Sequence, residues 1–149
     1  MGHFKFFIVF LIILFSVKAE AQSISEQKVP SVIVNNFKKK YPKAFDVDWE
    51  KHYKMYCVYF STTESPSQEV WYNESMETVK HVEEIVIKQV PEKIKKVIDD
   101  HYKKFKLDDL KRITIGKSIR YLIELDSKNE ELEITFNEQG EVLSKIKSD

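Results

Sequence analysis

Cys57 and His81 are the residue types that a nucleophilic enzyme would use. A cysteine needs a base held beside it, and histidine is a common choice. Cys57 is the single cysteine of the chain and lies in the segment MYCVYF. If both residues share the outer face of one sheet, they approach each other, but no third group orients the histidine. A lone cysteine in a strand is more often a small packed residue, so we predict no catalytic residues and no enzyme activity.

Asp46, Asp48, Glu50 and His52 form a second group of candidate ligands. Steps of two place them on one side of a β-strand, and their oxygen and nitrogen atoms suit calcium or zinc. Successive residues on that side lie roughly 6.6 Å apart, which spreads the charge instead of enclosing one ion. We therefore predict no metal and no cofactor. Metal binding by this stripe, or thiol chemistry by Cys57 with His81, is the alternative to the binding function described below.

Residues 1–21 have the three parts of a secretory signal: a basic start, an apolar run over residues 6–17, and Ala19 and Ala21 before the cleavage site. The apolar run is shorter than the roughly 20 residues of a membrane span. An uncleaved anchor is the alternative. No cysteine lies near the site for lipid attachment. We predict a periplasmic or secreted protein with no membrane span after cleavage.

The composition after residue 21 narrows the choice of partners. Without Lys5, Lys18 and Glu20, the 24 basic and 24 acidic residues of the whole chain become 22 and 23. This balance gives no reason to expect a nucleic acid partner. One cysteine cannot form an internal disulfide, so the core depends on packing alone, which a chain of this size can achieve.

One phrase occurs twice, 61 residues apart. VPSVIVNNFKKKYP, residues 29–42, and VPEKIKKVIDDHYKKF, residues 90–105, both begin with Val-Pro. Proline suits the first position of a helix, and apolar residues at steps of three and four form one stripe. The stripe of the second phrase is expected to extend to Phe105. The corresponding residues are Ile33 and Ile94, Phe37 and Ile98, and Tyr41 and Tyr102.

After each helix the hydrophobic period changes from 3.6 to 2. Alternating segments follow at 44–52, 55–60, 68–73 and 78–85, and again at 110–115, 118–125, 131–136 and 141–146. Such alternation indicates half-buried antiparallel strands, with Phe45, Val47 and Trp49 on the core face of the first strand. We predict an α+β fold of two tandem repeats, each one helix packed on a four-stranded antiparallel meander sheet. The predicted units are an N-terminal extension at 22–28, repeat 1 at 29–86 and repeat 2 at 87–149.

The outer face of the first meander is unusually apolar for an uncovered surface. Its residues oppose the phase of the core positions, and tyrosine and tryptophan dominate binding hot spots. A contiguous patch of this kind marks an interaction surface. Packing between the two sheets, or a homodimer, is the alternative. The predicted partner-binding residues are Met55, Cys57, Tyr59, Trp71 and Val79.

The chain resembles the PepSY-like, beta-lactamase-inhibitor-like family of small secreted bacterial proteins. YPKAFDVDWEK, YCVYF, VWYN and FNEQGEVL carry the resemblance, which covers about residues 28–147. It implies helix-on-sheet repeats in the cell envelope, with sheets that grip a partner protein. The cysteine pairs of the true inhibitors are missing. We expect an exported non-enzymatic binding module that docks an unidentified envelope protein or peptide, and inhibition of an enzyme rests on analogy of fold alone.

Overall fold

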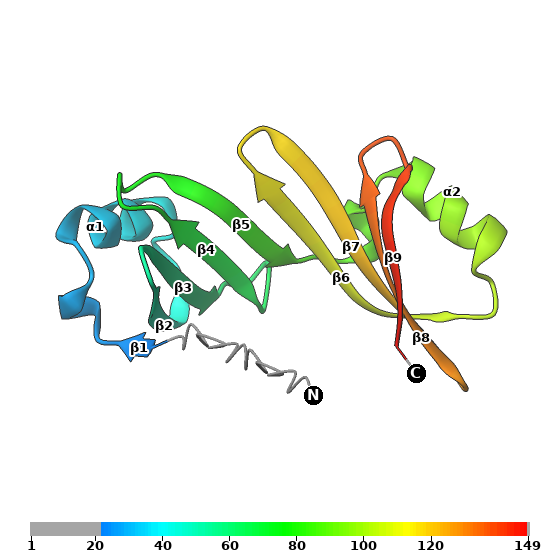
Figure 1. Ribbon diagram of the computed structural model, residues 1–149, viewed down its shortest axis with the longest axis horizontal. Helices are drawn as coiled ribbons and strands as arrows, with labels where there is room; N and C mark the ends of the chain where they lie inside the picture. The colour runs from blue at the N-terminus through cyan, green and yellow to red at the C-terminus, as the bar shows by residue number, and fades with distance from the viewer. Residues whose placement is uncertain (1–21, 149) are drawn as a thin grey trace, which may run out of the picture.

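The computed structural model describes residues 22–148, so the predicted signal peptide lies outside the described residues. No helix in this part of the chain is long and apolar enough to cross a membrane. Figure 1 shows the elements in chain order. They are β1 (Gln22–Ile24), η1 (Glu26–Lys28), α1 (Ser31–Lys40), β2 (Phe45–His52), β3 (Met55–Ser61), β4 (Gln68–Tyr72), β5 (Thr78–Glu84), η2 (Ile87–Gln89), α2 (Glu92–His101), β6 (Lys106–Ile115), β7 (Ser118–Ser127), β8 (Glu130–Asn137) and β9 (Val142–Ser148).

All the strands belong to one nine-stranded antiparallel sheet in the order β1 to β9. The mixed α+β class and the antiparallel pairing are therefore confirmed. The expected organisation of one four-stranded sheet per helix is not confirmed, because β5 pairs with β6 from His81 opposite Thr114 to Glu84 opposite Lys111 and joins the strands into one sheet. The one strand that was not expected is β1, which lies in the predicted N-terminal extension and pairs with β2. A strand of three residues is too short to show alternation in the sequence.

The two helices begin alike. Pro30 and Pro91 are the N-cap residues, and their carbonyls accept the N–H groups of Ile33 at 2.9 Å and Ile94 at 3.0 Å. The helices are shorter than the apolar stripes suggested. α2 ends at His101, so Phe105 lies beyond it, although its side chain still packs on the second core.

Each helix covers its own hydrophobic core. Ring centroids place Phe37 of α1 at 5.0 Å from Phe60 and 5.4 Å from Trp49. The first core contains Val29, Ile33, Val34, Phe37, Trp49, Val58, Phe60, Val70 and Tyr72. The second contains Ile85, Val90, Ile94, Ile98, Leu110, Tyr121, Ile123, Leu125, Leu132, Ile134 and Phe136.

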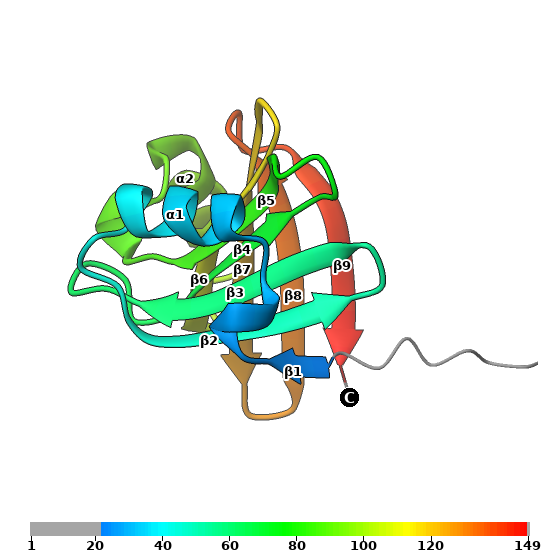
Figure 2. The ribbon, with the colours of Figure 1, turned by 90° about the vertical axis from the view of Figure 1, so that its left-hand side faces the viewer.

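Both helices lie on the same face of the sheet. The register aligns Val58, Val70, His81 and Thr114 across β3 to β6, and residues opposite each other point to the same side. The core side of the first meander thus continues into the second. In Figure 2 the strands β2–β4 run across the direction of β6–β9, which shows how strongly the sheet twists between the two cores.

The first half of β2 departs from the predicted alternation. Phe45 and Val47 were expected in the core, but they are 49% and 39% exposed, while Trp49 is buried. The register between β2 and β3 shifts between Phe45 and Asp48, and Asp46 has a φ of 52°. A β-bulge of this kind breaks the two-residue period, so side chains before it lose their expected face.

Two turns have the same construction, 64 residues apart. After β4, the side-chain oxygen of Asn73 accepts the N–H of Glu77 at 3.0 Å, and after β8 that of Asn137 accepts the N–H of Glu141 at 2.9 Å. The third residue after each asparagine has a positive φ. In the first turn this residue is Met76, with a φ of 65°, and in the second it is Gly140, with a φ of 85°.

Candidate functional site on the uncovered sheet face

The face opposite the helices is covered by no other element of residues 22–148. Its central row is set by the register, which places Glu50 opposite Cys57, Cys57 opposite Trp71, and Trp71 opposite Lys80. Tyr59 belongs to the next row. Four of the five predicted partner-binding residues, from Met55 to Trp71, therefore point to this face.

Trp71 is held in place from three sides. Its Nε1–H donates to Glu69 Oε1 at 2.6 Å, and Lys80 Nζ lies 2.8 Å from the same oxygen. The Lys80 ammonium also lies 5.4 Å from the Trp71 ring centroid, and the ring centroid of His52 lies 4.6 Å away. A side chain that is already fixed loses little conformational entropy when it binds a partner.

Met55, Trp71, Val79 and Lys80 line a shallow pocket of about 190 Å³. Val79 joins it because the register of β4 and β5 shifts between Trp71 and Tyr72, which leaves Val79 without a directly opposite residue. Met55 is 37% exposed at its rim. The structure thus brings three of the predicted residues together around one apolar depression.

Cys57 lies beneath this surface rather than in it. Its side chain is completely buried, and it shares a hydrogen bond with the side chain of Tyr59. Burial raises the pKa of the thiol to about 12. The cysteine therefore stays protonated at neutral pH and supports the neighbouring aromatic side chains from below.

His81 does not meet Cys57. It lies opposite Val70, on the helix side of the sheet, where its Nε2 is 3.0 Å from Gln68 Oε1 and its ring 5.9 Å from that of Tyr41. Burial also lowers the pKa of His81. The hypothesis that both residues share the outer face is wrong, because the parity of the ladder puts them on opposite faces.

The acidic stripe is also interrupted. Asp46 lies in the β2 bulge, while Asp48, Glu50 and His52 follow on the uncovered face. Glu50 Oε2 is 2.8 Å from His52 Nε2, so these two side chains pair with each other. Within residues 22–148, no group of three or more His, Cys, Asp or Glu residues is arranged to hold a metal ion.

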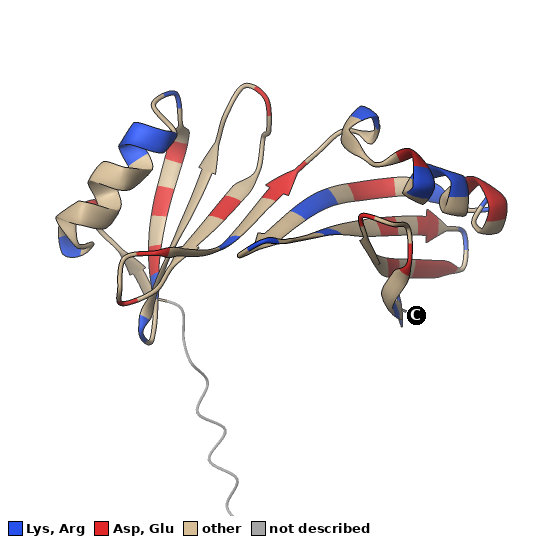
Figure 3. Ribbon diagram, turned by 90° about the horizontal axis from the view of Figure 1, so that it is seen from above, with Lys and Arg blue, Asp and Glu red and all other residues tan. Residues whose placement is uncertain are grey.

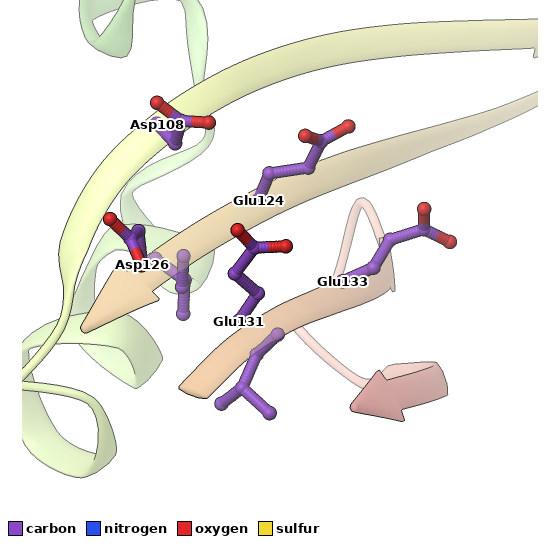
Figure 4. Close-up of a pocket in the computed structure, with 7 residues that line it drawn as sticks. Asp108, Glu124, Asp126, Glu131 and Glu133 are labelled. Atoms are coloured by element: carbon purple, nitrogen blue, oxygen red, sulfur yellow. The ribbon is translucent and has the colours of Figure 1, made fainter. Parts of the chain in front are cut away.

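A second depression lies on the same face of the other half, on β6, β7 and β8. It has a volume of about 140 Å³, and five carboxylates from these strands line it (Figure 4). Figure 3 shows acidic residues on strands of both halves of the sheet, including those of this second half. Sequence reasoning missed the group, although its members alternate with core leucines on β7 and β8. The five residues are Asp108, Glu124, Asp126, Glu131 and Glu133.

The family model described as "Putative beta-lactamase-inhibitor-like, PepSY-like" matches residues 15–62 and 54–144 of this sequence. The chain belongs to this PepSY-like family. Membership suggests a non-enzymatic binding module. No curated protein matches the sequence.

Solved structures share the PepSY-like fold at low sequence identity. A protein of Bacteroides eggerthii, described as "putative periplasmic proteins", has a TM-score of 0.71 at 18% identity, over 80% of this chain and 88% of its own. A DUF2874 family protein of Bacteroides uniformis has a TM-score of 0.70 at 18% identity, over 80% and 89%. A BLIP-like protein of Bacteroides fragilis has a TM-score of 0.66 at 19% identity, over 79% and 85%. At this identity the likeness shows the fold alone.

Proposed function

We propose that the protein is an exported, non-enzymatic binding module that docks a protein or peptide of the cell envelope through its uncovered sheet face. The observation that carries the proposal is the fixed position of Trp71 beside an apolar depression. Interaction hot spots are typically aromatic side chains in well-packed surroundings. Glu69, Lys80 and His52 supply such surroundings before any partner arrives.

Met55, Tyr59, Trp71 and Val79 are the proposed contact residues. Cys57 supports them from below, since no part of it reaches the surface. The docking mechanism is steric: the partner covers the face and desolvates its apolar side chains. Inhibition of a bound enzyme would follow if the covered surface included an active site.

Export is the second part of the proposal. Residues 1–21 act as a cleaved signal, which leaves Gln22 at the N-terminus of the mature chain. The likeness to a structure described as periplasmic supports this location. N-terminal sequencing of protein recovered from the envelope or the medium should begin at Gln22. Retention of Met1 or Gly2 would contradict the proposal.

We further propose that residues 29–86 and 87–149 are tandem repeats of one unit. The Val-Pro helix starts and the two asparagine turns support this, since each feature recurs at nearly the same offset along the chain. Under this proposal, docking evolved on the first unit while the second kept the same architecture with an acidic outer face.

The docking test measures binding and stability on the same variant. Tyr59→Ala combined with Trp71→Ala should weaken capture of partners from an envelope extract by about 2 kcal/mol or more, which is roughly 30-fold in affinity. Leu122→Ala is the matched control, because Leu122 lies on the same face of β7, in the other half. Capture that survives the double change while the melting temperature collapses would make these aromatics ordinary core and refute the docking role.

A further inference from the structure

The strand β9 ends the sheet with a long free edge. It pairs with β8 from Glu131 opposite Ser148 to Phe136 opposite Val142, and no strand of residues 22–148 pairs with its other side. Figure 2 shows β9 as the outermost strand beside β8. Backbone N–H and C=O groups along such an edge form a template for a further strand. The opposite edge, β1, has three residues, whereas β9 has seven.

Large apolar side chains are concentrated on this edge. Val142, Leu143 and Ile146 are 47%, 50% and 52% exposed. By contrast, Ile134 on the neighbouring strand β8 is completely buried. An added strand would pair the free backbone groups and would cover Ile146 on the uncovered face in one step, while Val142 lies opposite Phe136 on the helix face.

The charge of β9 indicates which kind of strand could pair with its free edge. Its charged residues are Lys145 and Lys147, both exposed, and residues 142–148 contain no acidic residue. In a symmetric antiparallel pair of two β9 strands, one residue faces its own copy. A register centred on Lys145 or Ile146 sets lysine against lysine, and one centred on Ser144 sets Leu143 against Lys145. In these three registers, residues 142–148 of a second copy offer no complementary charge.

We propose that β9 is a docking edge for an extended segment of another protein that alternates apolar and acidic residues. The segment adds as a tenth strand. The register fixes the alternation: Ile146 lies opposite Glu133 on the uncovered face, and Lys145 lies opposite Ile134 on the helix face. Apolar residues of the segment pack beside Ile146, while its carboxylates face Lys145 and Lys147. This edge is separate from the sheet face that carries the proposed docking function.

Two capped eight-residue peptides test the proposal, one alternating valine with glutamate and the other alternating valine with lysine. Amide hydrogen exchange of ¹⁵N-labelled protein reports the contact. The glutamate peptide should slow exchange of alternate β9 amides at least tenfold at saturation, because only every second N–H faces the free edge. The lysine peptide should leave exchange unchanged.

Charge reversal supplies the matched variants. Lys145→Glu with Lys147→Glu should weaken binding of the glutamate peptide about tenfold and confer binding of the lysine peptide. The control, Lys43→Glu with Lys117→Glu, makes the same change in net charge at exposed sites away from β9 and should behave as the native protein. Trp71→Ala should also leave the β9 response intact, so failure of the sheet-face proposal would be visible separately.

Three outcomes would overturn the inference. An absence of β9 protection with both peptides at millimolar concentration would show that the edge takes no strand. Equal protection by both peptides would show that charge does not select the occupant. Protection of β9 that rises with protein concentration, without any peptide, would assign the edge to a second copy.

Discussion

The two asparagine turns allow one substitution to be tested against its own counterpart. Met76 and Gly140 occupy equivalent positions, with φ of 65° and 85°. Glycine adopts this region freely, whereas a residue with a Cβ does so at a cost. We predict that Met76→Gly stabilises the protein and that Gly140→Ala destabilises it, although both substitutions change only a turn residue.

The magnitudes follow from the local geometry. The left-handed conformation costs a residue such as methionine roughly 1–2 kcal/mol. Glycine loses about 0.4–1 kcal/mol more entropy on folding, so Met76→Gly should gain about 0.5–1 kcal/mol in the free energy of unfolding. Gly140→Ala should lose about 2 kcal/mol, because a Cβ there would also lie 3.2 Å from the backbone carbon and oxygen of Lys93.

Urea denaturation followed by circular dichroism measures both changes. Intrinsic fluorescence provides a second probe, because coincident transitions are needed before two-state free energies are compared. Met76 is 40% exposed, so its replacement removes little buried surface. A fall of about 0.5 kcal/mol or more in the free energy of unfolding of Met76→Gly would refute the strain argument.

Two further predictions concern buried side chains. Phe37→Ala and Ile98→Ala should each lower the free energy of unfolding, measured by urea denaturation, by about 2–5 kcal/mol, because each leaves a cavity between a helix and the sheet. A loss below about 1 kcal/mol at either site would show that the apolar stripe of that helix is not buried. The buried Cys57 has its pKa raised from 9.0 to about 12, so its stabilising contribution is complete below pH 9 and is lost as the pH rises toward 12. The free energy of unfolding should therefore fall more steeply with pH in the native protein than in Cys57→Ala, by roughly 1 kcal/mol per pH unit for one such group. Equal slopes of the two proteins between pH 8 and 10.5 would contradict the raised pKa of Cys57.

Hydrophobic periodicity was enough to predict the elements of the fold. The two helices and eight of the strands follow directly from changes between periods of 3.6 and 2, because most strands have one face in a core. Periodicity does not specify which strand edges meet. The pairing of β5 with β6 depends on contacts between residues about 30 positions apart, such as His81 and Thr114, and nothing in either segment alone records it.

The candidate site was predictable to the extent that strand parity held. Met55, Tyr59 and Trp71 fall on the expected face, since β3 and β4 are regular up to the shift at Tyr72. His81 was misplaced because that shift alters the phase of β5 relative to β4. The acidic depression was missed for a different reason. Charged residues on a solvated face are common, and the register that sets Glu124 opposite Glu133 and Asp126 opposite Glu131 cannot be read from either strand alone.

The seam between β5 and β6 has a mechanical consequence. Only four residue pairs join the two meanders in register, supported by the Arg112 guanidinium 2.7 Å from Glu83. Each meander keeps its own helix and most of its own core. Bending the sheet along the seam therefore disturbs ladder hydrogen bonds and, among core side chains, chiefly Ile85, which follows β5 and belongs to the second core. We therefore expect the sheet to bend more easily along this seam than through either core. The aromatic depression and the acidic depression lie on opposite sides of the seam, so such bending would change the distance between them.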